Sequence, residues 1–319
     1  MPSIVRSRPM ENDRSIQVGV LADAEMLTGP HDRRRTRLEH VAQVGLDYVF
    51  VADHISFYTG FGMDGLIQAA TAAALEPTLG VHLGVYLLAL RHPVPVARQI
   101  ASLCESAPGR LVLGVGVGGE DRHEIEICGV DPSTRGRRTN ECLEVLRGLL
   151  SGESTDFSGE FFQLEKALIK PCPDPPVPIL IGGRSDAAIR RTARLGDGWL
   201  GVWCSPRRYK DVLAQVAEEA SEAGRNDVDW RHGLQIWVGV DETREAARKH
   251  LAARMESMYQ IPFERFEKYS PYGDPTEVAD FLAQYVEAGA GHFNIMIVGQ
   301  SSEAAIDAGA EIKAQLLKA

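Results

Sequence analysis

The adjacent residues Asp53 and His54 follow an apolar segment, residues 48–51, that has the length and composition of a buried strand. A carboxylate beside an imidazole can orient the ring and tune its affinity for a proton. The pair therefore has the composition of a general acid–base site. The alternative is a solvated loop pair without a catalytic role, and the two residues alone do not separate these interpretations.

A second candidate site lies in residues 177–191. An apolar run, residues 177–181, ends at Gly182 and Gly183, and the chain then passes through Arg184 to Ser185. Ser185 is a favourable N-cap for the helix that begins at the next residue. Glycines let the backbone approach a ligand, and the first N–H groups of a helix bind anions such as phosphate. The stretch predicts a phosphate site, with an ordinary strand-to-helix turn as the alternative.

Glycines mark the ends of two further apolar runs. Gly84 interrupts residues 79–88, and several glycines follow residues 111–113, namely Gly114, Gly116, Gly118 and Gly119. A glycine inside a strand marks a bulge or a close approach of a ligand to the backbone. The second group predicts a flat wall without side chains against a ring system or a phosphate. At Gly84 a packing glycine is the alternative, whereas the second group is denser than packing needs.

These residues must be positioned by the elements around them. Eight apolar segments alternate with helical patterns, and they cover residues 16–21, 48–51, 79–88, 111–115, 177–181, 198–203, 234–240 and 293–298. This alternation predicts the α/β class and a (β/α)8 TIM barrel. A doubly wound sheet is the runner-up, but no GxGxxG motif follows the first segment. In a barrel the candidate sites share one face, the C-terminal ends of the strands.

The barrel prediction also divides the chain. Residues 16–319 are predicted to form one barrel domain, and residues 1–15 a loose tail. Insertions are expected after the fourth strand, where residues 157–162 resemble a hairpin, and after the seventh, in the aromatic-rich residues 259–275. Both insertions are candidate lids that exclude water from the strand ends.

Composition narrows the class of protein. The chain has 319 residues, 44% of them hydrophobic and 24% charged, with a formal net charge of −10, which argues against a nucleic-acid groove. The five cysteines are scattered and form no CxxC pair, which favours a reducing cytoplasm. Neither a signal peptide nor an apolar run of membrane-spanning length is expected. No HExxH or GxSxG motif occurs, so neither a metal centre nor a nucleophile elbow is predicted.

Several of these motifs together resemble the luciferase-like monooxygenase superfamily, whose barrel enzymes use FMN or the deazaflavin coenzyme F420. The resemblance extends over nearly the full length. It depends on the motifs at residues 51–54, 90–93, 113–118, 181–185, 195–199 and 273–277, with the Glu-Ala-Gly of residues 287–289.

The resemblance implies roles for individual residues. His54 is implied as the catalytic residue, and the bond between Gly84 and Val85 as a cis peptide that braces the cofactor ring. In relatives the glycines after the fourth strand border the cofactor, and a turn after the fifth strand holds its phosphate. The implied cofactor-binding residues are Asp53, Gly84, Val85, Val117, Gly118, Gly182, Gly183, Arg184 and Ser185.

The chain departs from the sugar-phosphate dehydrogenases of the superfamily at three positions. Tyr58 stands where that branch has a tryptophan, and Ser205 stands where it has a lysine that binds the substrate phosphate. Gly119 stands at a glutamate of that branch, with Glu120 one residue later as a candidate general acid. These departures argue against a glucose-6-phosphate dehydrogenase.

The resemblance implies an oxidoreductase that transfers a hydride between F420 and a small organic substrate. The first alternative is an FMN-dependent monooxygenase that receives reduced flavin from a partner reductase. The second is a non-catalytic flavin-binding protein. A homodimer is expected from the resemblance, and Tyr58, Trp203 and Tyr272 indicate an aromatic substrate site.

Overall fold

The computed structural model describes residues 16–58, 60–119 and 121–318. Eight parallel strands close into a barrel, because the last strand in the order β9-β11-β1-β2-β3-β4-β7-β8 also pairs with the first. The barrel strands are β1 (Gln17–Leu21), β2 (Tyr48–Val51), β3 (Gly80–Leu87), β4 (Leu111–Gly116), β7 (Ile179–Gly182), β8 (Gly198–Val202), β9 (Gly233–Val240) and β11 (His292–Val298). The predicted TIM barrel is confirmed. The predicted tail and Glu120 lie outside the described residues.

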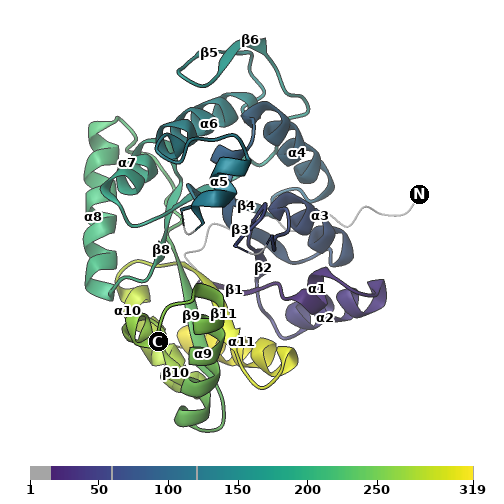
Figure 1. Ribbon diagram of the computed structural model, residues 1–319, viewed down its shortest axis with the longest axis vertical. Coiled ribbons are helices and arrows are strands. Elements are labelled where there is room, and N and C mark those ends of the chain that lie inside the picture. Colours follow the sequence, from purple (N-terminus) through teal and green to yellow (C-terminus); the bar gives the residue numbers. More distant parts are fainter. Residues whose placement is uncertain (1–15, 59, 120, 319) are drawn as a thin grey trace.

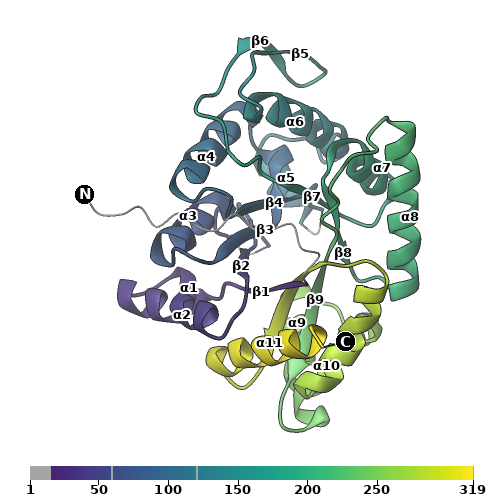
Figure 2. The same ribbon diagram turned by 180° about the vertical axis from the view of Figure 1, so that it is seen from behind.

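Helices surround the strands, as both ribbon views show (Figure 1, Figure 2). Because both faces of the sheet are covered, strands such as β2 and β4 are buried at every residue and read as continuous apolar runs. The helices are α1 (Ala24–Leu27), α2 (His31–Gln43), α3 (Gly65–Leu75), α4 (Pro93–Ser106), α5 (Arg122–Ile127), α6 (Arg135–Leu150), α7 (Asp186–Leu195), α8 (Pro206–Glu222), α9 (Arg244–Tyr259), α10 (Pro275–Glu287) and α11 (Ser302–Leu316).

Polar side chains fix the starts of the helices that follow the strands. The carboxylate of Asp64 accepts from two backbone N–H groups of α3, and the hydroxyl of Ser185 accepts from the Ala188 N–H of α7. Asp274 and Glu277 form a capping box at α10. These caps satisfy N–H groups that have no partner inside the helix, so they set where each strand-to-helix loop ends.

The two predicted insertions are present, but only one of them reaches the barrel mouth. The first is the hairpin of β5 (Thr155–Ser158) and β6 (Gln163–Ala167), which lies beyond α6 at the edge of the molecule (Figure 1). It is held there by Glu141 of α6, whose carboxylate accepts from the N–H groups of Glu160, Phe161 and Phe162. The expectation that this hairpin is a lid is therefore wrong.

The second insertion follows α9. It contains two short 3-10 helices, Phe263–Arg265 and Glu267–Tyr269, and the short strand β10 (Tyr272–Gly273), which pairs with β9. Phe263 is fully buried, and the ring of Phe266 lies 5.0 Å from that of Trp203 at the end of β8. This segment therefore covers the C-terminal ends of the strands from one side.

The opposite face of the barrel holds three histidines, of which His82 is buried and His232 and His292 are half-buried. The ring of His82 in β3 stacks on Tyr48 at 3.6 Å, and the ring of His292, the first residue of β11, lies 6.1 Å from His82. His232 accepts a hydrogen bond from the Trp199 N–H at its Nδ1. Burial lowers the pKa of His292 and of His232 to about 4, and it lowers that of His82 well below the usual value.

These histidines are expected to make the fold sensitive to acid. Between pH 6.5 and 4 they bind protons in the unfolded chain and stay neutral in the folded one, so unfolding becomes more favourable as the pH falls. For His292 the loss is roughly 2 kcal/mol by pH 5. A His292→Gln variant should show a smaller decrease in urea midpoint between pH 7.5 and 5 than the wild-type protein. The exposed His31→Gln is the control, and equal decreases in His292→Gln and wild type would contradict this account.

Candidate functional site

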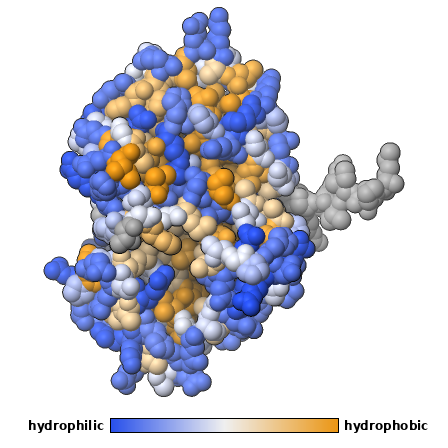
Figure 3. Space-filling view, turned by 45° about the vertical axis from the view of Figure 1, so that its right-hand side comes forward, coloured by the Kyte–Doolittle hydropathy of each residue, from blue (hydrophilic) through white to orange (hydrophobic). Residues whose placement is uncertain are grey.

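The C-terminal ends of the strands enclose a cavity of about 300 Å³, here called the strand-end cavity. Figure 3 shows a hollow in the surface whose floor is coloured towards the hydrophobic end of the scale. Of the catalytic and cofactor-binding residues that the family resemblance implied, Ser185 does not line this cavity. The others do, and they are Asp53, His54, Gly84, Val85, Val117, Gly118, Gly182, Gly183 and Arg184. Residues from four separate strand ends therefore meet in one place, as the barrel prediction required.

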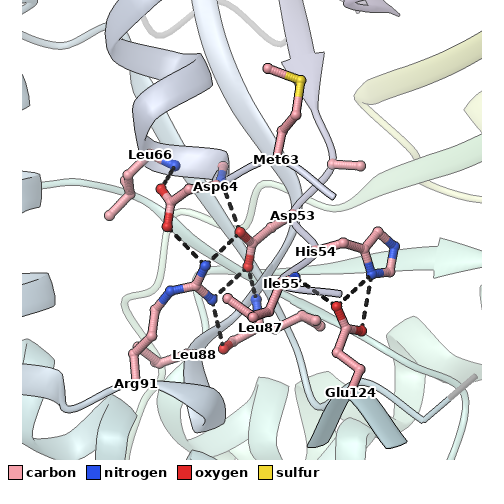
Figure 4. Close-up of polar contacts among 12 residues, drawn as sticks. Asp53, His54, Ile55, Met63, Asp64, Leu66, Leu87, Leu88, Arg91 and Glu124 are labelled. Atoms are coloured by element: carbon pink, nitrogen blue, oxygen red, sulfur yellow. Dashed lines mark hydrogen bonds and ion pairs between the residues drawn. The ribbon is translucent and has the colours of Figure 1, made fainter. Parts of the chain in front are cut away.

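Asp53 forms a buried ion pair at the end of β2. Its two carboxylate oxygens each lie 2.8 Å from a guanidinium nitrogen of Arg91 (Figure 4). The same oxygens accept from the N–H groups of Gly65, at 2.8 Å, and Leu87, at 2.9 Å. The second guanidinium edge of Arg91 reaches Asp64 at 2.9 Å, and its plane lies over the ring of Tyr86. One carboxylate thus joins the ends of β2 and β3 to the start of α3.

The acceptor positions of Asp53 are fully used by these contacts, because a carboxylate offers about four lone-pair sites. Burial raises its pKa, and the charge of Arg91 together with the two N–H groups opposes that rise. The expectation that Asp53 orients the His54 ring is wrong, because the carboxylate contacts Arg91 and the backbone instead. Asp53 therefore acts in the cavity wall as a positioning residue, which holds Arg91 and the backbone of Gly65 and Leu87.

Glu124 orients His54 instead. The Nδ1 of His54 lies 3.1 Å and 3.3 Å from the two carboxylate oxygens of Glu124 (Figure 4). The carboxylate also accepts from the N–H groups of Ile55, at 2.6 Å, and Ser56, at 3.0 Å. Since this carboxylate already accepts two hydrogen bonds, the network assigns the proton to Nδ1. Nε2 is then the ring nitrogen left to act on a molecule in the cavity.

Glu124 comes from α5, a helix of six residues in the loop after β4. Asp121 caps this helix, and its carboxylate also accepts from the Tyr58 N–H at 2.6 Å. Helix α5 therefore holds the backbone of residues 54–58 at two points. Glu124 was not predictable from the sequence, because a six-residue helix carries no periodic pattern and 70 residues separate Glu124 from His54.

The peptide bond between Gly84 and Val85 is cis, as the resemblance implied. A side chain at Gly84 would collide with Gln235 of β9 and Asn294 of β11, whose amides share a hydrogen bond of 3.2 Å. Gln235 also lines the strand-end cavity. These two amides form a polar contact inside the barrel that the sequence analysis did not identify, because both lie in strongly apolar strands.

The glycines around Val85 serve packing. Side chains at Gly116 of β4 or Gly182 of β7 would meet the methyl groups of Val85, and one at Gly114 would meet the Leu83 carbonyl. The side chain of Val85 therefore fills the space that was expected to be a flat wall without side chains, and the neighbouring glycines leave room for it. Gly118 differs, because its φ of 69° lies in the left-handed region that favours glycine.

The turn after β7 has the geometry expected of an anion site. Gly183 has a φ of 116°, which side chains rarely allow, and its carbonyl accepts from the indole N–H of Trp199 at 2.7 Å. Helix α7 begins after the Ser185 cap, so its first N–H groups and the positive end of its dipole face the turn. The exposed Arg184 adds a positive charge beside the cavity. Ser185 contributes through the cap and not as part of the cavity wall.

Other kinds of site are not found. In residues 16–58, 60–119 and 121–318, no group of three or more histidine, cysteine or acidic side chains is arranged to hold a metal ion. Over the same residues, the helices are too short or too polar to cross a membrane. All five cysteines are free.

The sequence model of the luciferase-like monooxygenase family matches residues 18–268. An uncharacterised protein of Mycobacterium tuberculosis strain H37Rv is 36% identical over 188 residues, which are 56% of this chain and 65% of that protein. The chain thus matches somewhat less than two thirds of that relative's length. A protein of Kineococcus radiotolerans named F420-dependent glucose-6-phosphate dehydrogenase is 30% identical over 287 residues, which are 80% of this chain and 84% of that protein.

Solved structures resemble the whole barrel. An F420-dependent secondary alcohol dehydrogenase in complex with an F420-acetone adduct has a TM-score of 0.81 at 23% identity, covering 93% of this chain and 98% of that one. A monooxygenase from Streptomyces bottropensis has a TM-score of 0.75 at 19% identity, with the same coverage. At these identities the structures show a shared fold. The family match and the 30% identical relative show more: the chain belongs to the luciferase-like monooxygenase family, a family of oxidoreductases.

Proposed function

We propose that this protein is an F420-dependent oxidoreductase that acts on a small organic substrate. The observation that carries the proposal is the strand-end cavity, in which the cis bond, the glycine turn after β7 and an oriented histidine meet. The names of the relatives support the choice of cofactor, because a 30% identical protein and the best-fitting solved structure described above are both F420-dependent.

The residues present fit a phosphate-bearing planar cofactor. The Gly182–Gly183 turn, the start of α7 and Arg184 would hold the phosphate, since a Cβ at Gly183 would come within 3.1 Å of Ala188 and narrow the turn. Val85, Val117 and Gly118 would contact the ring, because they line the cavity between the turn and His54. Asp53, which lines the cavity, and Arg91 behind it would hold these walls in place through their ion pair.

F420, when bound, supplies a carbon that accepts or donates a hydride. His54 would act on the substrate oxygen, donating a hydrogen bond to it from a protonated Nε2 or accepting its proton at a neutral one. Glu124 keeps the ring in one orientation and stabilises the charge that the ring gains when it takes a proton. Tyr259, the last residue of α9, lines the cavity wall and packs against Phe266 of the segment after α9, which would exclude water from this side.

We do not propose glucose 6-phosphate as the substrate, although a relative is named F420-dependent glucose-6-phosphate dehydrogenase. The structure shows no compensation for two of the three departures from the sugar-phosphate dehydrogenases, those at Tyr58 and Ser205. Ser205 caps α8 through its hydroxyl, and Tyr58 lies at the mouth, so neither supplies the positive charge that a substrate phosphate needs.

The second candidate is an FMN-dependent monooxygenase, which the name of the matching family favours. It would need reduced flavin from a partner reductase. Both candidate functions would use the turn after β7 to hold a phosphate, so the affinities for the two cofactors must be measured to separate them.

Direct titration of the purified protein with F420 and with FMN tests the proposal. We expect F420 to bind at least about tenfold more tightly than FMN, a difference of about 1.4 kcal/mol in binding free energy. Isothermal calorimetry measures both affinities. Tight FMN binding without F420 binding would overturn the proposal in favour of the monooxygenase.

Gly183→Ala should weaken cofactor binding about tenfold or more, because the backbone must leave its φ of 116° and the turn loses its shape. Gly129→Ala is the matched control. It also removes a glycine with positive φ, but nothing lies within 4 Å of its added Cβ, and Gly129 does not line the strand-end cavity. Equal cofactor affinity in the two variants would contradict the assigned role of the turn.

Glu124→Gln should lower kcat roughly tenfold while the cofactor Kd stays within about twofold, because the amide orients the ring without stabilising its charge. His54→Ala should lower kcat on the order of a hundredfold. Glu126→Gln, on the same short helix but paired with Arg122 at the surface, is the control. The assay is turnover of the best substrate from a screen of alcohols and carbonyl compounds. Full turnover by a His54→Ala protein that binds cofactor normally would refute this assignment.

A further inference from the structure

A second cavity adjoins the strand-end cavity. It measures about 690 Å³ and shares the lining residues Arg184, Trp203 and Tyr259 with its neighbour, so the two lie side by side. It lies between the loop after β2, which contributes Tyr58, and the segment after α9. A molecule that fills it would therefore lie next to whatever occupies the strand-end cavity.

Aromatic rings form most of its wall. They are Tyr58, Trp203, Tyr259, Phe266 and Tyr269. The ring of Trp203 packs edge-on against Tyr259 at 5.3 Å and tilted against Phe266 at 5.0 Å, which fixes its plane. Rings held in this way offer flat faces on which a planar molecule can stack.

The backbone presents two of these rings from unusual conformations. Tyr58 has a φ of 44° and Trp203 a φ of 45°. For bulky residues the left-handed region costs energy, and residues held in it cluster at binding sites. The two residues lie on opposite sides of the cavity, one after β2 and one in the loop after β8.

Two arginines give the cavity a positive charge. Arg184 lies 5.6 Å from the centre of the Trp203 ring, and Arg265 lines the same wall. No acidic residue is among the described residues that line it. The acidic side chains nearest in sequence to Arg265, those of Glu264 and Glu267, pair with Arg248 instead. The positive charge of this wall contrasts with the net charge of −10 of the whole chain.

We propose that this aromatic–arginine cavity binds the substrate, and that the substrate has a planar, conjugated body and a carboxylate or another anionic group. The rings would take the body by stacking, and Arg265 would take the anion through charge-assisted hydrogen bonds. The assignment of the occupant as substrate rests on the proposed function. The other source of the same chemistry is the anionic tail of the cofactor itself, and the experiment separates the two.

The probes are 2-naphthoate, which is planar and anionic, 2-naphthamide, which is planar and neutral, and cyclohexanecarboxylate, which is anionic without a flat ring. Calorimetric titrations are made on the protein without cofactor and on the protein saturated with F420. We expect 2-naphthoate to bind about tenfold more tightly than either other probe, and to bind in the presence of F420.

Two variants locate the interactions. Arg265→Gln should weaken 2-naphthoate about tenfold and leave 2-naphthamide unchanged, because only the anion loses a partner. Tyr269→Leu should weaken both planar probes about threefold and leave cyclohexanecarboxylate unchanged. Arg207→Gln, an exposed arginine of α8 outside the cavity, is the control and should change none of the affinities.

The outcomes are distinct. Binding of 2-naphthoate only to the protein without F420 would assign the cavity to the cofactor tail and overturn the proposal. Equal affinities for the three probes, or no effect of Arg265→Gln, would overturn it as well. If F420 fails to bind at all, the proposed function falls, whereas the titrations without cofactor still measure whether the cavity selects a planar anion.

Discussion

The ion pair between Asp53 and Arg91 fixes the geometry on which the site depends. The Asp53 side chain is fully buried, and it receives two guanidinium and two backbone hydrogen bonds at the junction of β2, β3 and α3. A buried carboxylate is tolerated only when its hydrogen bonds are this complete, and loss of Arg91 would leave that of Asp53 without its charge partner at a cost of several kcal/mol. Because the pair starts one residue before His54, the position of that imidazole depends on it.

The loop that carries His54 is held from its other side by α5. Glu124 contacts the imidazole and two backbone N–H groups, and Asp121 holds the Tyr58 N–H. The two carboxylates have different roles. Asp53 fixes the point at which the loop after β2 leaves the barrel, and Glu124 fixes the orientation of the His54 ring. In the neighbouring strand β3, Val85 lies where Gly116 and Gly182 leave room for it, so this part of the cavity wall is built from three strands. The site is therefore a property of the closed barrel and not of any single motif.

The barrel was predictable from the sequence because its parallel strands are covered on both faces and appear as largely apolar runs. The turn after β7 was equally visible, since Gly183 and the Ser185 cap act through local backbone conformation, and its binding of a phosphate stays a prediction. The cis bond at Gly84 followed only from the resemblance to a family. Contacts between distant segments were not predictable: Glu124 meets His54 through a six-residue helix, and Gln235 meets Asn294 across the barrel. Adjacency in sequence suggested Asp53 as the partner of His54, but consecutive residues at a strand end point in different directions.

The central claim is that the strand-end cavity holds F420 with its reacting ring beside a histidine that Glu124 orients. A crystal structure of the protein in complex with F420 measures this directly. The account predicts the phosphate at the Gly182–Gly183 turn and the start of α7, the ring against Val85 and Gly118, and the His54 Nε2 facing the reacting edge of the ring. A phosphate bound elsewhere, or a ring turned away from His54, would contradict it.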